Sequence, residues 1–454
     1  MNSSAGKLSA AAIILALLAS VWISYNLKIW KRENRVLVWD VMEYYSYLPA
    51  TFIHHDPTFR FVENSSDEVR KHFWVHTAPN GGKYIKMTMG MSVLYAPFFL
   101  MAWAVESLSS SGPVYGFSTT FKFFMMLGSW TYLLLGLLFL RAVLRRYFSD
   151  VVTAITLFSI VAGTNLLFYS SIEACMSHAY NFSLFAVFLW LTIRYYEKPS
   201  TARLAVIGLL AGLISLIRPS NSILLLVFFG WGITSLSDLK ERITFFLSRI
   251  PSLMLMGFCI LLVWLPQMVL WKINTGHWMF YTYGDEGFFF TRPALLKGLF
   301  SWRKGWLLYT PMMALALTGF LFLKKRIPQA FWPLLIFTIA NIWIVTSWWS
   351  WWYGGSLGMR PMIDSYSLLA LPLAAFIAWF LEKKRSIRIA GLALIFLLNF
   401  HSVFQTFQYY YGAIHWDSMS RKAYFSSFGH LHPQAGFQEM LDPPDYAAAK
   451  KGVR

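Results

Sequence analysis

At residues 36–50 the chain reads VLVWDVMEYYSYLPA, directly after its first hydrophobic segment. This stretch places two carboxylates, Asp40 and Glu43, beside three tyrosines at the edge of a predicted membrane helix. In a helix, Asp40, Glu43 and Tyr44 are three and four residues apart and share one face. Carboxylates near lipid are costly unless they face a cavity, so both are candidates for function. The alternative is an interfacial segment, with its tyrosines in the aromatic belt and its acids in water.

The composition is that of an integral membrane protein. Of the 454 residues, 57% are hydrophobic and 13% are charged, whereas soluble domains carry roughly 25% charged residues. The formal net charge of +18 comes from short basic clusters between hydrophobic segments. This distribution follows the positive-inside rule, and anionic lipid headgroups would also attract such basic clusters. It argues against nucleic acid as a partner. The two cysteines give no disulfide framework.

The hydrophobic segments predict the helices. The first, about residues 8–27, is too long for a signal-peptide core, so we expect a retained first membrane helix. Further spans are expected at 88–107, 117–140, 151–170, 178–196, 204–218, 222–236, 250–271, 305–323, 329–348, 364–381 and 386–404. No strand pattern competes, so the sequence predicts an all-α polytopic membrane protein of about 11–13 transmembrane helices. Residues 1–404 would form this membrane domain, with a polar first loop at about 28–87, and residues 405–454 a short C-terminal tail.

Basic residues at every second connection predict the orientation, because such connections are expected in the cytoplasm. These clusters are Arg141/Arg145/Arg146, Arg194/Lys198/Arg203, Lys240/Arg242/Arg249, Lys324/Lys325/Arg326 and Lys383/Lys384/Arg385/Arg388. The loop at 28–87 does not fit simply. If 88–107 crosses the membrane, the loop is inside, in agreement with its own Lys28 and Arg35. If the loop is outside, 88–107 is a re-entrant or surface-lying helix, and the residues alone leave both arrangements open.

Three stretches carry a resemblance to a known superfamily: WDVMEYYSYLPA at 39–50, GMSVLYAPFF at 90–99 and WYGGSLGMRP at 352–361. Together with a long polar first loop followed by many helices, they make the chain similar to the GT-C superfamily of integral membrane glycosyltransferases. The nearer likeness is to bacterial relatives of protein O-mannosyltransferases and of lipid A aminoarabinose transferases. The similarity in architecture covers nearly the whole chain, whereas the motifs themselves are short.

The resemblance implies a GT-C-like bundle in the bacterial inner (plasma) membrane. It implies a polyprenyl-phosphate-linked sugar as donor, membrane lipid as surroundings, and an acceptor that is a glycan, a lipid or a protein. Transfer would take place on the extracytoplasmic face, and the acidic residue of the first loop, which maps to Asp40, would be catalytic. It also favours an extracytoplasmic 28–87 loop and therefore an irregular helix at 88–107.

Glycosyl transfer from a lipid phosphate needs a base near the acceptor hydroxyl and positive charge near the leaving phosphate. We expect Asp40 to be the base and Glu43 its helper, or else a contact to metal or acceptor. The candidates for substrate binding are the outward cations and neighbouring aromatic residues: Tyr44, Tyr45, Arg218, Arg292, Arg303, Lys304, Trp352, Tyr353 and Arg360. For each arginine the alternative is a snorkelling anchor at the interface, and for the aromatic residues a membrane belt. Asp364 is expected to be the structural partner of Arg360.

A divalent metal ion is the only cofactor that the sequence suggests. Glu173 and His178 in the connection before the 178–196 span are candidate ligands, since some relatives place a metal-binding acid there. No tight ligand spacing is present, and His178 is equally explained as a packed, hydrogen-bonded histidine. The segment His54–Asp56 is a further candidate for the same ion, although adjacent histidines point in different directions.

Two other classes of function compete with a glycosyltransferase. A transporter or lipid flippase would commonly show repeated halves with broken helices, and no such symmetry is visible in the sequence. An O-antigen ligase or polymerase would carry its large loop late in the chain, whereas the polar loop here comes early. A cavity shared by Asp40 and one of the outward arginines would favour the transferase.

Overall fold

A computed structural model describes residues 6–109 and 112–453 of the chain. Almost all of its regular structure is helical. The strands found in the described residues are β1 (His76–Thr77) and β2 (Lys83–Tyr84), an antiparallel pair in the first loop. The prediction of an all-α polytopic membrane protein is therefore confirmed.

Within the described ranges, seven helices are long and apolar enough to cross a membrane. They are α1 (Lys7–Asn26) with the turn η1 (Ile29–Lys31), α4 (Gly90–Ser109), α5 (Thr119–Leu144), α12 (Ile250–Thr275), α16 (Pro328–Ser347), η4 (Arg360–Ser365) with α17 (Tyr366–Leu381), and α18 (Arg385–Tyr411). Other helices of the bundle are α6 (Asp150–Ala162), α8 (Ser177–Glu197), α9 (Thr201–Ile217) and α15 (Met312–Arg326).

The remaining helices are short or lie in the connections. They are α2 (Asp40–Phe52), η2 (Arg60–Asn64), α3 (Asp67–Arg70), α7 (Leu166–Ser171), η3 (Pro219–Leu224), α10 (Leu225–Gly230), α11 (Leu236–Leu247), α13 (Leu295–Phe300), α14 (Trp306–Tyr309), α19 (Arg421–Ser426), η5 (Gln438–Met440) and α20 (Tyr446–Lys450).

Besides the span at 305–323, which is divided between α14 and α15, two further predicted spans are not continuous helices. The span at 151–170 is divided, because α6 ends at Gly163 and the chain turns before α7. The span at 222–236 consists of the turn η3, which begins at Pro219, and the six-residue α10, which ends at Gly230. Proline and glycine explain both breaks, since proline cannot donate a helical hydrogen bond and glycine readily leaves the helix.

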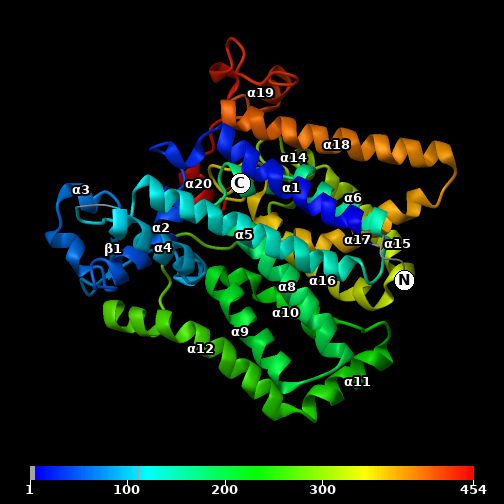
Figure 1. Cartoon of the computed structure of the whole chain (residues 1–454), viewed down its shortest axis with the longest axis horizontal. Helices are drawn as coiled ribbons and strands as arrows, with labels where there is room; N and C mark the ends of the chain where they lie inside the picture. Colours follow the sequence, from blue (N-terminus) through cyan, green and yellow to red (C-terminus); the bar gives the residue numbers. More distant parts are fainter. Residues whose placement is uncertain (1–5, 110–111, 454) are drawn as a thin grey trace.

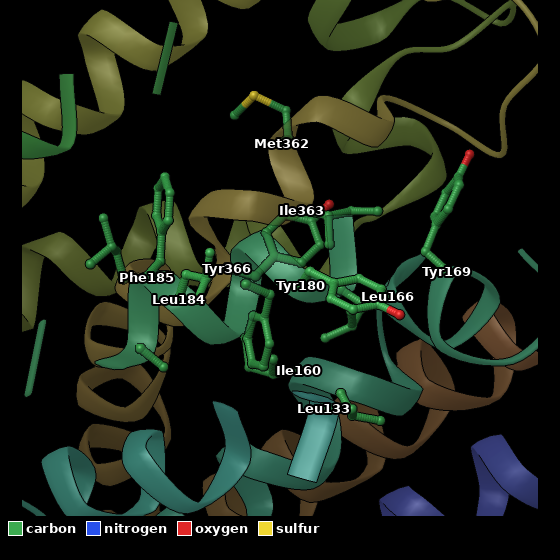
Figure 2. Close-up of a cluster of buried hydrophobic side chains, with 14 of the residues drawn as sticks. Leu133, Ile160, Leu166, Tyr169, Tyr180, Leu184, Phe185, Met362, Ile363 and Tyr366 are labelled. Carbon is green, nitrogen blue, oxygen red and sulfur yellow. The ribbon is translucent and has the colours of Figure 1, made fainter. Parts of the chain in front are cut away.

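The core lies where α5, α6, α7, α8 and the start of α17 meet. Figure 2 shows this cluster, in which side chains from all of these elements converge. Its members are buried: Leu133 from α5, Ile160 from α6, Leu166 and Tyr169 from α7, Tyr180, Leu184 and Phe185 from α8, Met362 and Ile363 from η4, and Tyr366 from α17. Small residues allow the neighbouring helices to approach closely. A Cβ on Gly319 of α15, for example, would meet the backbone carbonyl of Pro372 in α17.

The predicted basic connections gather at one end of the bundle. The end of α5 pairs with the end of α8 through Arg146 and Glu197, and Arg326 at the end of α15 pairs with Glu382 after α17 at 2.5 Å. At the same end, Arg141 of α5 donates to the carbonyl of Gly6 at 3.0 Å, which places the start of α1 there. Figure 1 shows this end on the right, whereas the first loop with α2, α3 and the strands lies on the left. The basic clusters thus lie on one side of the bundle, opposite the first loop.

Helices α5 and α8 run side by side in the same direction, because Tyr132 packs against Tyr180 and, further along, Phe139 packs against Trp190. The connection between α8 and α9 is short, and α9 returns along α8. The start of α5 and the end of α9 therefore lie on the same side of the bundle, the side of the first loop.

Helix α4 stays on that side. Just before it, the Thr88 hydroxyl donates to the carbonyl of Leu216 at the end of α9. At its other end, Glu106 accepts a hydrogen bond from Ser118, which precedes α5. Although α4 has the length and hydropathy of a membrane span, both of its ends lie beside the first loop. This agrees with the interpretation of residues 88–107 as a surface-lying helix.

The orientation of this bundle can be tested by cysteine labelling, since both native cysteines, Cys175 and Cys259, are buried. We expect a cysteine at exposed Lys325 or Lys384 to resist a membrane-impermeant maleimide in whole cells, because positive connections stay in the cytoplasm. A cysteine at exposed Asn80, in the first loop, should react. Labelling of both lysine positions together with protection of position 80 would reverse the orientation.

Candidate functional site

A large cavity opens at the end of the bundle that carries the first loop. Its volume is about 1050 Å³, and segments far apart in the sequence line it. These segments are parts of 34–44, Lys86 and Met87, the connection 172–176, the turn 217–221, parts of 281–288, parts of 344–355, Arg360 and Pro361, and parts of 409–446. The C-terminal tail thus forms part of the wall.

Asp40 reaches the cavity because it is the first residue of α2. The helix has 3.6 residues per turn, so Tyr44 lies about 40° from Asp40, whereas Glu43 lies about 60° away on the opposite side. Tyr44 accordingly lines the cavity. Glu43 instead turns toward the protein, where it is 8% exposed and its carboxylate accepts a hydrogen bond from the Met87 backbone N–H at 3.0 Å. The three residues therefore do not share one functional face.

Arg360 is the ion-pair partner of Asp40. Its Nη2 lies 3.0 Å from Oδ2 of Asp40, and both side chains line the cavity. Arg360 begins η4, directly after a turn in which Gly354 and Gly358 have positive φ. The expectation that Asp364 would pair with Arg360 is wrong, because Asp364 lies further along and turns into the core.

Asp364 forms a buried cluster around Arg218. One carboxylate oxygen, Oδ1, lies 3.0 Å from Nδ1 of His178. The other, Oδ2, accepts hydrogen bonds from Asn181 at 3.0 Å and Asn221 at 2.9 Å, and lies 3.4 Å from Nη1 of Arg218. Arg218 lines the cavity, whereas Asp364 and His178 lie behind it. Four partners thus fix the carboxylate that holds this guanidinium at the cavity wall.

Glu173 is another carboxylate at the cavity. It lies in the connection between α7 and α8, where the chain turns after Ser171. In the part of the chain that the structure describes, its carboxylate makes no hydrogen bond or ion pair. Burial raises the pKa of Glu173, and the nearby guanidinium of Arg360 partly offsets this rise.

These residues do not form a metal site. In residues 6–109 and 112–453, no group of three or more His, Cys, Asp and Glu side chains is arranged to hold an ion. The predicted ligand pair is divided, since Glu173 lines the cavity and His178 is buried with its Nδ1 on Asp364. In the first loop, Asp56 accepts the N–H groups of Thr58 and Phe61, each at 2.9 Å, so it stabilises a turn.

Some of the predicted binding residues lie away from the cavity. The ring of Tyr45 is buried between Phe99 and Phe117, and its hydroxyl donates to the carbonyl of Gly116. Trp352 is buried against Tyr446 of α20, with ring centroids 5.4 Å apart. Tyr353, next in sequence, does line the cavity.

The cations of the segment 292–304 have other partners. Arg303 pairs with Asp442 of the tail at 2.9 Å, and Arg292 is exposed outside the cavity. Lys304 is buried and donates to the carbonyls of Ser356 and Trp416, and burial lowers the pKa of its ammonium group to about 7. Lys304 therefore holds the tail against the segment before Arg360.

The sequence analysis missed several groups at the cavity. Lys86 and Glu286 form an ion pair of 2.7 Å at its wall, joining the first loop to the segment after α12. Arg35 also lines the cavity, although its charge had been considered only for orientation. No local pattern identifies such residues, since each reaches the cavity through long-range packing.

The buried carboxyl group of Glu43 predicts a pH-dependent stability. Burial, followed by the nearby charge of Asp40, raises its pKa from 4.5 to about 7. Because the folded state holds this proton more tightly than the unfolded state, the group weakens the fold as pH rises from about 4.5 to 7, by at most about 3 kcal/mol. Thermal unfolding in detergent should therefore show Glu43→Gln gaining stability relative to the wild type between pH 5 and pH 8. A constant difference across this range would contradict the assignment.

No protein-family model matches the sequence, and no curated protein matches it. The structure is similar to the oligosaccharyltransferase of Archaeoglobus fulgidus, solved in complex with zinc and sulfate. The identity is 15% and the TM-score 0.49, and the match covers 87% of this chain and 52% of that protein. The match therefore covers about half the length of that protein. At this identity and TM-score, the similarity assigns neither an activity nor a substrate to the present chain.

Proposed function

We propose that the chain is a membrane glycosyltransferase that moves a sugar from a polyprenyl-phosphate donor to an acceptor hydroxyl. The observation that supports this proposal most is that Asp40 lies in the same cavity as two mostly buried arginines, Arg218 and Arg360. One cavity thus offers a proton acceptor and a site for a leaving phosphate, which are the two groups that this reaction needs. The stretches around Asp40 and Arg360 are also those that carry the sequence resemblance to GT-C enzymes.

In the proposed reaction, the acceptor oxygen attacks the anomeric carbon of the donor sugar while its proton passes to the carboxylate of Asp40. The bond between the anomeric carbon and the phosphate oxygen breaks, and its electron pair leaves with the polyprenyl phosphate. Only Oδ2 of Asp40 is occupied by Arg360 among the described residues. The other oxygen, Oδ1, is available to a hydroxyl group, and a base within hydrogen-bond reach contributes typically ~10²–10⁴-fold to the rate.

The leaving phosphate would be held by Arg218 and Arg360. A guanidinium group presents five N–H donors in a planar fork that matches phosphate oxygens, so each arginine keeps donors beyond those directed at its own carboxylate. Arg218 is further restrained by the Asp364 cluster behind it. Because the hydrogen-bond donors of Arg218 are already oriented, little further ordering is needed when negative charge develops on the leaving phosphate.

An apolar side of the cavity suits the polyprenyl chain. Ile217 and Pro219 flank Arg218, and Ile344 and Val345 come from the end of α16, a helix with the length and hydropathy of a membrane span. Trp348 follows directly and also lines the cavity. A lipid held here would keep its tail in the membrane and its phosphate beside Arg218.

A transporter or flippase fits the cavity less well. Alternating access needs a path to the opposite end of the bundle, whereas the lining residues come from segments at the end that carries the first loop. The shared cavity of Asp40 with Arg218 and Arg360 is the arrangement that favours a transferase.

Replacing Asp40 tests the base. Asp40→Asn keeps an oxygen for Arg360 but cannot take a proton, so turnover with polyprenyl-phosphate sugars should fall by about 100-fold or more, while donor affinity changes little. Glu173→Gln, which changes another cavity carboxylate, should cost less. Thermal unfolding must show that both variants are folded, and a folded Asp40→Asn enzyme with full activity would exclude Asp40 as the base.

Replacing Arg218 tests the phosphate site. Arg218→Ala should weaken binding of polyprenyl phosphate by about 10–100-fold, as expected for a charge-assisted contact. Arg218→Lys keeps the charge beside Asp364 but loses the planar fork of the guanidinium group. Its affinity for polyprenyl phosphate should lie between those of the wild type and Arg218→Ala. Arg292→Ala is the matched control, since Arg292 is exposed and lies outside the cavity. Equal affinity of the Arg218→Ala and Arg292→Ala proteins would refute this part of the proposal.

A further inference from the structure

An exposed tryptophan pair lies at the cavity, next to Asp40. Trp39 lines the cavity and is 71% exposed, and its ring packs edge-on against Trp74, which is 39% exposed, with centroids 6.1 Å apart. Both residues belong to the first loop, and neither has a role in the proposed donor site. A tryptophan left open at the cavity, with a second partly exposed tryptophan against it, needs an explanation, because burial of such rings is strongly favourable.

The backbone of Trp39 is strained. Its φ is 52° and its ψ is −138°, a region that bulky L-residues rarely adopt. The residue stands at the N-cap of α2 without a side-chain capping bond, so the strain brings no capping interaction. Because the ring is exposed, burial of the side chain does not offset it either. Strained residues persist where the surrounding structure imposes them, and they gather at binding sites.

Charged hydrogen-bonding groups line the same cavity as Trp39. In the β1–β2 hairpin, His76 pairs with Tyr84, and Lys86 lies two residues beyond this pair in the chain. The ammonium of Lys86 lies 2.7 Å from Glu286, and both residues line the cavity. The cavity thus holds an aromatic surface together with a hydrogen-bond donor and an acceptor for hydroxyl groups.

We propose that Trp39 and Trp74 form the acceptor subsite, and that the acceptor is a glycan whose pyranose ring packs on the Trp39 indole. The inference rests on the proposed function, which it deepens by naming the class of acceptor. The C–H face of a pyranose is apolar and slightly positive and suits the negative face of an indole, while its hydroxyl groups need polar partners such as Lys86 and Glu286.

The position in the cavity separates this ligand from the donor. Trp39 directly precedes Asp40, so a ring that rests on Trp39 can present a hydroxyl group to the carboxylate. The polyprenyl phosphate is assigned to Arg218 and to the apolar residues at the end of α16, which belong to other segments of the wall. The group bound at Trp39 is therefore the one that gives up a proton.

Two measurements test the subsite, both on the full chain in lipid nanodiscs. In the first, saturation-transfer NMR with maltotriose and chitotriose, without donor, should show contact of the ring C–H protons with the wild type. The signal should be lost in Trp39→Ala and retained in Trp39→Phe. In the second, the acceptor KM of Trp39→Ala should rise about 10-fold, while the donor KM and donor hydrolysis in water stay unchanged. Trp278→Ala is the control, because Trp278 is 51% exposed and lies outside the cavity.

The outcomes separate this inference from the proposed function. If the wild type transfers sugar and Trp39→Ala keeps its acceptor KM, the acceptor is a peptide or a lipid bound elsewhere, and the subsite is refuted while the transferase stands. A loss of membrane association shared by Trp39→Ala and Trp39→Phe, with unchanged KM, would make Trp39 an interfacial anchor and also refute it. If no polyprenyl-phosphate sugar supports transfer by the wild type, the proposed function fails, and absence of the NMR contact would then refute glycan binding independently.

Discussion

The ion pairs that hold two arginines at one cavity determine how the rest of the site is built. Taking a guanidinium or a carboxylate out of water is costly unless partners replace the lost hydration. Arg360 meets this requirement through Asp40, which is 320 residues away in the sequence. Arg218 meets it through Asp364, whose second oxygen binds His178. These contacts join α2, α8, the turn after α9 and η4, so the position of each charge depends on the fold as a whole.

The same pairs constrain the chemistry. A carboxylate that both anchors an arginine and accepts a proton must divide its oxygens between the two tasks, and Asp40 does so by giving only Oδ2 to Arg360. In the proposed reaction the charge of the leaving phosphate would fall next to Arg360 as well, which would couple the proton acceptor to the phosphate site. The Asp364 cluster is different, because its carboxylate is fully buried and has four partners. It orients Arg218 and takes no part in the cavity itself.

The helical membrane architecture and the position of Asp40 could be predicted from the sequence, since both depend on local patterns: long hydrophobic segments and an acid at the edge of one of them. The ion-pair partner of each charged residue could not be predicted in the same way. Asp364 stands one helical turn beyond Arg360, which suggested a local pair, but η4 carries the two side chains to different sides and Arg218 arrives from another segment. Adjacent residues were separated in the same way, with Tyr44 at the cavity and Tyr45 in the core. The roles of these residues stay predictions.

The geometry of α2 bears on both proposed substrates. Its first residue, Asp40, stands at the cavity, and the strained Trp39 before it leaves the helix direction, so the chain presents an acid and an aromatic ring side by side. Further along, Met42 and Leu48 are buried and the carboxylate of Glu43 binds the Met87 N–H, which fixes the helix against the segment before α4. The helix is thus held by its later turns and is free to act only at its start. A substitution that rotated it by one residue would remove Asp40 from Arg360 and move Trp39 at the same time, so the proposed acceptor recognition and the proposed catalysis would both depend on a single helix register.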